Sequence, residues 1–451
     1  MKQSFDLIVR GGECVTPAGV FRCDLGIVDG RIAALGDLVA HGSEATLEAA
    51  GLTILPGVID TQVHFREPGM EHKEDLESGT RSAAQGGVTT VFEMPNTKPA
   101  TTNREALEDK LRRAAGRAWC DYAFFVGATE QNVKQLPELE LLPGCAGVKL
   151  FMGSSTGDLL VAESDAVLSV LRNGRRRMSV HSEDEARLKE RFALVEGGAK
   201  TTMHPVWRDA VTALSNTERL LRLARQAGRR THVLHVTTGE EMELLAVNKD
   251  LATVEVTPQH LTLSAPECYE RLGSRAQMNP PIREEAQRQA LWRAVDSGVV
   301  DVLGSDHAPH TLEEKGQAYP KSPSGMTGVQ TLLPLMLDHV AAGRLSLERL
   351  VDLTSAGPAR IFGIASKGRI AVGFDADLSI VDLKARRTIT DDWIASRAGW
   401  TPYDGVEVRG WPSTTLVRGR VVMQDGELAD KPLGEPVKFL ETLEPEGGPS
   451  R

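Results

Sequence analysis

The stretch Val58-Ile59-Asp60-Thr61-Gln62-Val63-His64 joins a β-prone apolar run to polar side chains near its end. Seven further β-prone runs follow, and most of the intervening segments have the apolar spacing of helices. Regular alternation of strand and helix predicts parallel strands with helical crossovers, and eight units are what a (β/α)₈ TIM-type barrel requires. The eight runs are 57–64, 88–94, 122–126, 147–151, 178–181, 231–236, 253–256 and 299–305.

A doubly wound open sheet is the competing α/β architecture for this alternation. Such a sheet commonly carries a G-x-G-x-x-G motif after its first strand. No such motif follows the run at 57–64, so the barrel is the favoured interpretation.

The two ends of the chain have a different texture, with short β-prone runs and Gly-containing turns. Runs at 6–12 and 26–32 resemble runs at 375–382 and 414–422, more than 300 residues away. We predict one small β-sandwich domain from both ends. The predicted boundaries are 1–54 and 364–440 for the sandwich, 55–363 for the barrel and 441–451 for a frayed tail.

Composition excludes several classes of function. The 451 residues are 41% hydrophobic and 25% charged, as in ordinary globular proteins, and the net charge is -10. This charge argues against general binding to nucleic acid or anionic lipid. The five cysteines contain no C-x-x-C pair, and no apolar run approaches the roughly 20 residues of a membrane span. We therefore predict a cytoplasmic protein without disulfides.

Five candidate metal ligands lie at or near the ends of different β-prone runs. The active sites of such barrels lie at the carboxyl ends of their strands, so these side chains are expected to converge. Neutral imidazole and carboxylate oxygen suit Zn²⁺ or a similar divalent ion. Taken singly, the histidines are more typical of a hydrogen-bonded core, the lysine of a salt bridge, and the aspartate of a helix cap. The five are His64, Lys149, His181, His235 and Asp306.

Lys149 is unusual because its neighbours in Gly147-Val148-Lys149-Leu150-Phe151 are apolar. A lysine on a buried strand is costly unless it is paired or covalently modified.

Longer motifs resemble the amidohydrolase superfamily and, within it, the dihydroorotases of the longer bacterial type. The resemblance covers nearly the whole chain. It implies the predicted barrel and a return of the chain to the β-sandwich. The motifs are Leu55–Asp60 continuing into His64-Phe65-Arg66-Glu67-Pro68-Gly69, Glu93-Met94-Pro95-Asn96-Thr97, Met278-Asn279-Pro280-Pro281, Ser305-Asp306-His307-Ala308-Pro309-His310, and Lys367-Gly368-Arg369-Ile370 through Asp375-Ala376-Asp377-Leu378.

The resemblance places all five candidates in a metal centre, with Lys149 carbamylated so that it becomes a bridging carboxylate. This chain departs from the family's H-x-H pair on the first strand, because Gln62 stands where the first histidine is expected. An amide oxygen is a weaker ligand than imidazole. One zinc ion is therefore predicted, with two as the alternative. A second departure, Gln259 in place of a histidine, has no mechanistic interpretation.

By the same resemblance, a second set of residues binds the substrate. Arg66 offers a planar, permanently charged fork for a carboxylate, which Asn96 and His310 would help to hold. Asn279 would contact the edge of the pyrimidine ring. Without the resemblance, Asn96 and Asn279 are equally typical of turns beside proline.

The implied reaction is the reversible cyclisation of N-carbamoyl-L-aspartate to L-dihydroorotate in pyrimidine biosynthesis. A metal-activated water or hydroxide would attack in the hydrolytic direction, with Asp306 as general base and then general acid. Two alternatives stay open: a cyclic amidase for hydantoin, dihydropyrimidine or allantoin, and a non-catalytic dihydroorotase-like scaffold. Expected partners are the small substrate, further copies of the chain, and aspartate transcarbamoylase, which some relatives bind.

Overall fold

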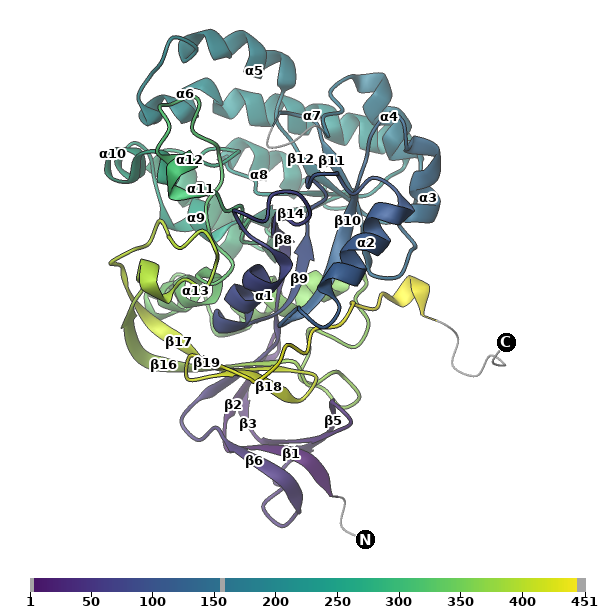
Figure 1. Cartoon of the computed structure of the whole chain (residues 1–451), viewed down its shortest axis with the longest axis vertical. Helices are drawn as coiled ribbons and strands as arrows, with labels where there is room; N and C mark the ends of the chain where they lie inside the picture. Colours follow the sequence, from purple (N-terminus) through teal and green to yellow (C-terminus); the bar gives the residue numbers. More distant parts are fainter. Residues whose placement is uncertain (1–3, 155–158, 444–451) are drawn as a thin grey trace.

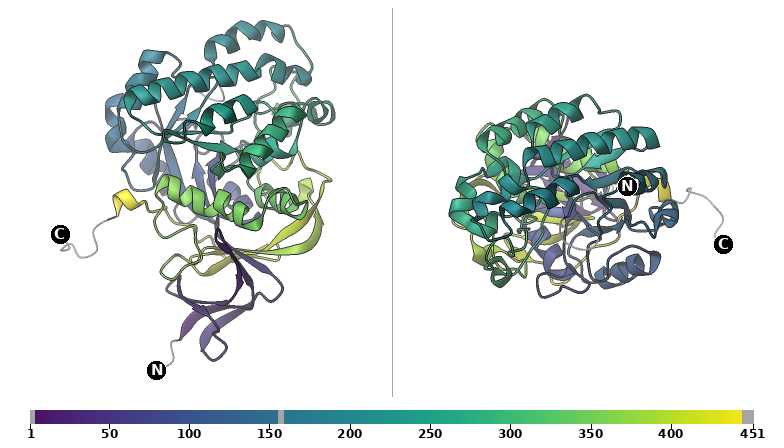
Figure 2. Two further views of the ribbon diagram at one scale, coloured as in Figure 1. Left: turned by 180° about the vertical axis from the view of Figure 1, so that it is seen from behind. Right: turned by 90° about the horizontal axis from the view of Figure 1, so that it is seen from above.

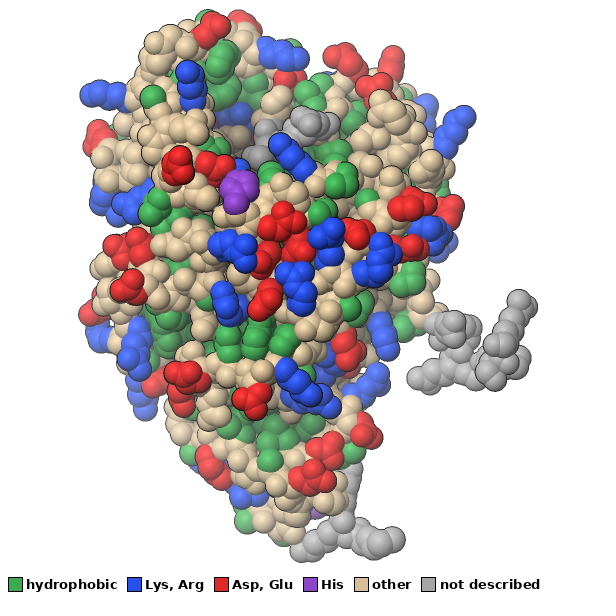
Figure 3. All heavy atoms as spheres, viewed as in Figure 1, with side chains coloured by type: hydrophobic (Ala, Val, Ile, Leu, Met, Phe, Trp, Pro, Cys, Tyr) green, Lys and Arg blue, Asp and Glu red, His purple; other side chains and the backbone are tan. Residues whose placement is uncertain are grey.

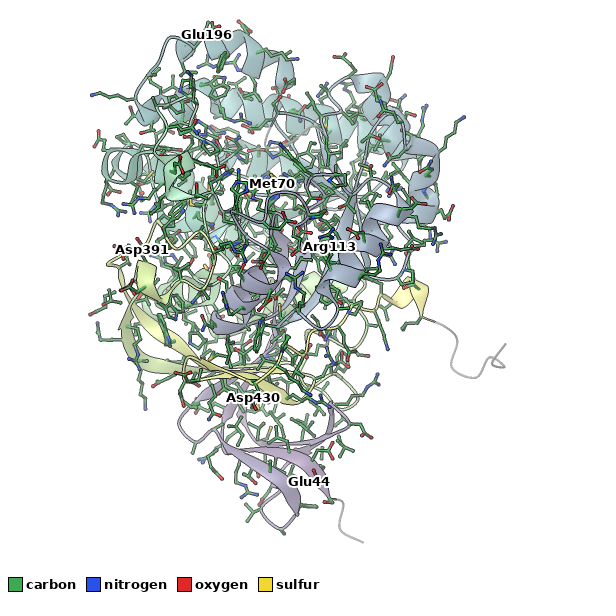
Figure 4. All side chains as sticks on the ribbon, viewed as in Figure 1. Glu44, Met70, Arg113, Glu196, Asp391 and Asp430 are labelled. Carbon is green, nitrogen blue, oxygen red and sulfur yellow. The ribbon has the colours of Figure 1, made fainter. Side chains whose placement is uncertain are left out.

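The structure of the protein is a computed structural model that describes residues 4–154 and 159–443. A larger body of strands and helices stands on a smaller β-domain, and the two lie along the longest axis of the molecule (Figure 1). Glu44 in the small domain and Glu196 among the upper helices mark the two extremes of this axis (Figure 4).

The larger body is a barrel of eight parallel strands in sequence order. It closes where the first strand meets the loop after the last: the backbone N–H of His64 donates to the carbonyl of His307 at 2.7 Å. The strands are β8 (Val58–Val63), β9 (Val88–Glu93), β10 (Asp121–Gly127), β11 (Cys145–Phe151), β12 (Met178–His181), β13 (Thr231–Val233), β14 (Ala252–Val256) and β15 (Val302–Leu303).

Helices surround these strands, as the view from above shows (Figure 2, right). They follow the strands in the alternation that the sequence predicts. The α-helices are α1 (Leu76–Gln85), α2 (Arg104–Ala114), α3 (Leu136–Leu139), α4 (Ser164–Arg172), α5 (Glu185–Arg191), α6 (His204–Trp207), α7 (Ala210–Ala227), α8 (Gly239–Ala246), α9 (Pro258–Thr262), α10 (Glu267–Leu272), α11 (Glu285–Asp296), α12 (Leu312–Lys315), α13 (Leu332–Ala341), α14 (Leu347–Val351) and α15 (Gly357–Phe362).

Local chemistry fixes where several helices begin and end. Asp75 caps the start of α1 by accepting from the backbone N–H of Ser78 at 2.8 Å, and the Ser78 hydroxyl completes a capping box. The long helix α7 ends at Gly228, whose φ of 67° is left-handed and favours glycine. Every residue of β10 and β11 is buried, as expected for parallel strands covered by helices on one side and packed in a barrel on the other.

Two strands are shorter than the sequence predicts by three residues or more. The run at 231–236 gives a strand only to Val233, and the run at 299–305 gives only Val302 and Leu303. The physical reason is that the chain leaves the strand conformation to place His235 and Asp306, whose φ angles are 39° and 45°.

The smaller domain is a β-sandwich built from both ends of the chain, which we call the end domain. Its two sheets have the orders β5-β4-β1-β6 and β19-β18-β17-β16-β7-β2-β3. The strands are β1 (Phe5–Arg10), β2 (Glu13–Thr16), β3 (Gly19–Arg22), β4 (Asp24–Val28), β5 (Arg31–Gly36), β6 (Ser43–Glu48), β7 (Thr53–Pro56), β16 (Leu378–Thr388), β17 (Glu407–Val417), β18 (Arg420–Gln424) and β19 (Glu427–Leu428).

Apolar side chains from both sheets, including Leu7, Ile54 and Leu378, fill the core of the end domain. The predicted fold class, a TIM-type barrel with a small β-domain from both chain ends, is therefore confirmed. The domain boundaries given above stay predictions. Of the predicted tail, residues 444–451 lie outside the described residues.

Acidic and basic side chains are interspersed over the face drawn in Figure 3. All five cysteines are free, as predicted. In the part of the chain that the structure describes, no helix combines the length and the apolar character that crossing a membrane requires.

Candidate functional site

A small cavity lies at the carboxyl ends of the barrel strands. Gln62 lies within β8 and Lys149 within β11, while His181 is the last residue of β12. His235 and Asp306 follow β13 and β15 on the loops. Eight of the nine predicted site residues line this one cavity together with Gln62: His64, Arg66, Asn96, Lys149, His181, His235, Asn279 and Asp306.

One side of the cavity is formed by Lys149, His181 and His235, which we call the histidine arm. The Nδ1 of His181 lies 3.0 Å from the Nε2 of His235, and both rings are buried. Burial lowers the pKa of His181 and holds the pKa of His235 well below its ordinary value. Both imidazoles are therefore neutral near pH 7, and neutral imidazole is the form that binds a metal ion.

His181 is oriented by a carboxylate that the sequence analysis missed. Its Nε2 lies 3.0 Å from Oε2 of Glu183, and the guanidinium of Arg208 donates to Oε1 of Glu183 at 3.1 Å. Burial alone would raise the pKa of Glu183, but Arg208 and His181 outweigh it and lower the pKa to about 2. A carboxylate behind a ligating histidine fixes its ring orientation. The spacing His181-Ser182-Glu183, with both side chains on one side of the chain, was the available signal.

Lys149 is a buried lysine with little to stabilise a positive charge. It is 1% exposed, and among the described residues its Nζ makes no hydrogen bond or ion pair. Its Nζ lies over the ring of Phe151, 4.5 Å from the ring centroid. Burial lowers its pKa to about 7. Burial thus favours the neutral amine of Lys149, which is the nucleophilic form.

The other side of the cavity is formed by Gln62, His64 and Asp306, which we call the glutamine arm. The amide of Gln62 donates to Oδ1 of Asp306 at 3.0 Å, and Nε2 of His64 lies 3.2 Å from the same oxygen. The Nδ1 of His64 lies 2.8 Å from Oδ1 of Asn96. The members of this arm therefore bind mainly to each other, while the buried Oε1 of Gln62 has no hydrogen-bond partner among the described residues.

Three site residues have left-handed backbone conformations that residues other than glycine rarely adopt. The φ angles are 66° at Arg66, 39° at His235 and 45° at Asp306. Such conformations cost about 1–3 kcal/mol each and cluster at functional sites. Here they turn the three side chains into the cavity at the points where the strands have ended.

Arg66 lies at the rim of this arrangement and is 1% exposed. Its Nε donates to the carbonyl of Pro309 at 3.1 Å, and its Nη2 lies 3.3 Å from Nε2 of His310. Burial lowers the pKa of Arg66 to about 10, so the group stays charged at neutral pH. His310 lies behind Arg66 and is not among the residues that line the cavity, so its contact with substrate stays a prediction.

The cavity is small, and a larger cleft adjoins it. The free space between the two arms is about 20 Å³, enough for one water molecule or one ion. Asn279 and Ser324 also line a cleft of about 500 Å³, whose other walls include Phe192, Trp207 and Pro323. A substrate would reach the two arms from this cleft.

A zinc ion in this cavity would have to be held by the nitrogen and oxygen donors of its side chains. Within the described residues, no three His, Cys, Asp or Glu side chains are close enough together to hold a metal ion. The 3.0 Å between the facing nitrogens of the histidine arm is close to the roughly 3.3 Å expected for two imidazoles on one tetrahedral zinc. Carbamylation of Lys149 would add the missing carboxylate. The residues fit one ion, on condition that Lys149 is modified.

Comparison with known proteins places the chain in a family. The model of the amidohydrolase family matches residues 53–422. The chain belongs to the amidohydrolase family. The family resemblance stated from the sequence motifs is thereby confirmed.

Amidohydrolases with different names are similar to this chain over nearly its whole length. A dihydroorotase of Methanosarcina mazei is 38% identical over 421 residues, which cover 90% of this chain and 91% of the relative. An allantoinase of Deinococcus radiodurans is 36% identical over 444 residues, covering 96% and 98%. The solved L-hydantoinase (dihydropyrimidinase) from Arthrobacter aurescens superposes with a TM-score of 0.92 at 31% identity, covering 96% and 99%.

Proposed function

We propose that this amidohydrolase is a dihydroorotase, which interconverts N-carbamoyl-L-aspartate and L-dihydroorotate in pyrimidine biosynthesis. The observation that carries the proposal is a buried, charged Arg66 on the wall of the cavity. Dihydroorotate carries a carboxylate, whereas hydantoin and allantoin rings do not require a cationic partner. Dihydroorotases of archaea at 33–39% identity support the same choice.

Arg66 is arranged to receive an acid. The Nε of Arg66 donates to the carbonyl of Pro309, and its Nη2 lies within hydrogen-bond distance of Nε2 of His310. Its Nη1 makes no hydrogen bond to any described residue. Burial also lowers the pKa of His310 to about 3, so this neighbour stays neutral and does not compete for the carboxylate. A buried guanidinium with a free donor favours a charge-assisted bond to the substrate carboxylate.

The proposed metal ligands are His64, Lys149, His181, His235 and Asp306, with one zinc ion in the histidine arm and carbamylated Lys149 as the third donor. A bound divalent ion would lower the pKa of water and polarise the ring carbonyl. The short space between the arms would keep the reacting groups close together and exclude bulk water.

Asp306 is the proposed general base and acid. Gln62 and His64 both bind its Oδ1, and Oδ2 has no hydrogen-bond partner among the described residues. In hydrolysis, this oxygen would take a proton from the attacking water and return it to the ring nitrogen as the amide C–N bond breaks. The Oδ1 of Asn279 lies 3.1 Å from Nε2 of His204, which orients the amide. The Asn279 side chain would then contact the edge of the substrate ring from the side of the cleft.

The proposal is tested by measuring hydrolysis of dihydroorotate and cyclisation of carbamoyl aspartate with zinc-loaded protein. Arg66→Met should lower kcat/KM for dihydroorotate at least about 10³-fold, because the substrate carboxylate would lose its charged partner. The same variant should change turnover of unsubstituted hydantoin, if any is present, by less than about tenfold.

Arg66→Lys is the matched control, since it keeps the positive charge and loses the planar guanidinium. Its activity on dihydroorotate should lie between that of the original protein and that of Arg66→Met. Circular dichroism and the Tm of each variant show whether the protein is folded. Equal loss on charged and uncharged rings would contradict the role of Arg66. No turnover of dihydroorotate by metal-loaded protein would contradict the proposed function, and no turnover of any cyclic amide would favour a scaffold.

A cyclic amidase for a substituted, uncharged ring is the second candidate. The cleft of about 500 Å³ beside the cavity favours it, because Leu188, Phe192 and Trp207 give this cleft an apolar wall that dihydroorotate would not use. A panel of hydantoins with apolar substituents, assayed beside allantoin and dihydroorotate, distinguishes the two. A kcat/KM that rises with the size of the substituent, and exceeds that for dihydroorotate, would establish the second candidate.

A further inference from the structure

Arginine side chains gather in a second pocket, at the amino ends of the barrel strands. The strand β12 separates Arg177, which precedes it, from His181 at its other end, about 13 Å along the strand. The pocket has a volume of about 230 Å³ and shares no lining residue with the cavity of the proposed active site. Its basic lining residues are Arg175, Arg176, Arg177, Arg230 and Arg360.

The positive charge of this arginine pocket is only partly compensated. Glu441 is the one acidic residue in the described lining, and its Oε2 lies 3.0 Å from Nε of Arg176. The Nη1 of Arg360 lies 3.5 Å from Oδ1 of Asp352, a residue outside the pocket.

Three arginines of the pocket have no ion pair in the described chain. The side chains of Arg175 and Arg230 are exposed and make no hydrogen bond or ion pair to described residues. Arg177 binds only the carbonyl of Thr231, at 3.0 Å. Elsewhere, on the face drawn in Figure 3, basic side chains alternate with acidic ones. The pocket is thus a local concentration of cations on a protein whose net charge is -10.

Buried donors in the pocket also lack acceptors. Arg176 is 8% exposed, and its Nη1 donates to the carbonyl of Cys145 at 2.9 Å. Among the described residues, its buried Nη2 has no hydrogen-bond partner, and the buried Nε of Arg177 has none either. Buried polar groups are nearly always hydrogen-bonded, and charged donors are the most costly to leave unsatisfied. The described residues therefore leave part of the hydrogen-bonding capacity of these two guanidinium groups unused.

We propose that the arginine pocket binds a small molecule through a phosphate group. Guanidinium forks match the oxygens of a tetrahedral oxyanion, and several converging arginines favour a multiply charged one. The ring of Phe439, 4.9 Å from the guanidinium of Arg176, supplies an apolar wall for the organic part of the ligand. The volume of about 230 Å³ suits a small phosphate ester or a diphosphate.

The pocket assignment is independent of the proposed reaction, because the ligand site and the substrate site have no residue in common. Isothermal titration of the full chain with pyrophosphate and with glycerol 3-phosphate, at constant ionic strength, tests it. Saturable binding of one molecule per chain is expected. Arg175→Ser with Arg230→Ser should weaken it at least about tenfold.

The matched control is Arg222→Ser with Arg369→Ser, which removes two exposed, unpaired arginines away from the pocket. This control should bind like the original protein. Arg66→Met removes the cation of the catalytic cavity and should also leave binding unchanged. Absence of saturable binding, equal weakening by the control pair, or loss of binding on Arg66→Met would each overturn the arginine pocket as the phosphate site.

Discussion

The two arms of the catalytic cavity are built in opposite ways. In the histidine arm, His181 is held from behind by Glu183 and Arg208, so its Nδ1 remains directed at His235. In the glutamine arm, Gln62 and His64 are bound to Asp306 itself. In the glutamine arm the polar groups bind mainly to one another, whereas in the histidine arm Lys149 has no hydrogen bond or ion pair to the described residues.

This difference shows how one substitution can give the two sides of a metal site different roles. An amide at position 62 can donate a hydrogen bond to Asp306, which a metal-ligating imidazole could not do through its ligating nitrogen. The glutamine arm is therefore suited to holding a carboxylate for proton transfer. The histidine arm is suited to binding an ion once Lys149 carries a carboxylate.

The largest effect is expected from Lys149→Ala, which breaks the histidine arm. The proposed third donor would be lost, so kcat/KM for dihydroorotate should fall at least about 10³-fold and zinc content should fall with it. Steady-state kinetics and metal analysis measure both. Propionate should restore part of the activity, because a free carboxylate can occupy the space left by the side chain.

Lys134→Ala, at an exposed lysine that has no hydrogen bond or ion pair among the described residues, is the control and should behave like the original protein. Retention of more than about a tenth of the activity by Lys149→Ala would exclude the lysine as a ligand.

A smaller effect is expected from Glu183→Gln, which keeps the shape of the group behind His181 and removes its charge. Metal affinity should fall about 10–100-fold, because the imidazole loses the carboxylate that orients it. Competition with a chelator measures the affinity. Glu190→Gln, at an exposed residue of the neighbouring helix α5, should have no effect. An unchanged affinity in the Glu183 variant would mean that Arg208 and packing alone orient His181.

The smallest change in activity is expected from Gln62→His, which makes the glutamine arm resemble the histidine arm. A second imidazole beside His64 should raise the zinc content from about one to about two ions per chain. The change in kcat/KM should stay below about tenfold, since the histidine arm is untouched. Two ions already bound by the original protein would show instead that Gln62 does not weaken the glutamine arm.

Much of the fold could be predicted because its signals are local. Alternation of β-prone and helix-period runs reflects burial of strands under helices, and it gave eight strands in the observed order. The ends of β13 and β15 could not be predicted in this way. Their apolar runs continue to Val236 and Ser305, but the backbone bends earlier to place His235 and Asp306 in left-handed conformations.

The candidate site was predictable to the extent that functional side chains stand near strand ends. Most of the contacts that support them were not, because the residues that make these contacts are distant from each other in the sequence. Arg208 reaches Glu183 across 25 positions, and Gln62 reaches Asp306 across 244. The place of His310 behind Arg66 likewise follows from how the loop after β15 packs, and its contact with substrate stays a prediction.

The sequence by itself determined the barrel, the end domain made from both chain ends, the family, and which side chains could meet. These depend on periodicity and on residue types, which are properties of the chain. Only the tertiary structure decided that the two arms differ. It also decided that, among the described residues, Lys149 has no ion partner and arginines without ion pairs gather at the opposite end of the strands. Those features depend on burial and on the distance between side chains, which arise only when remote segments pack together.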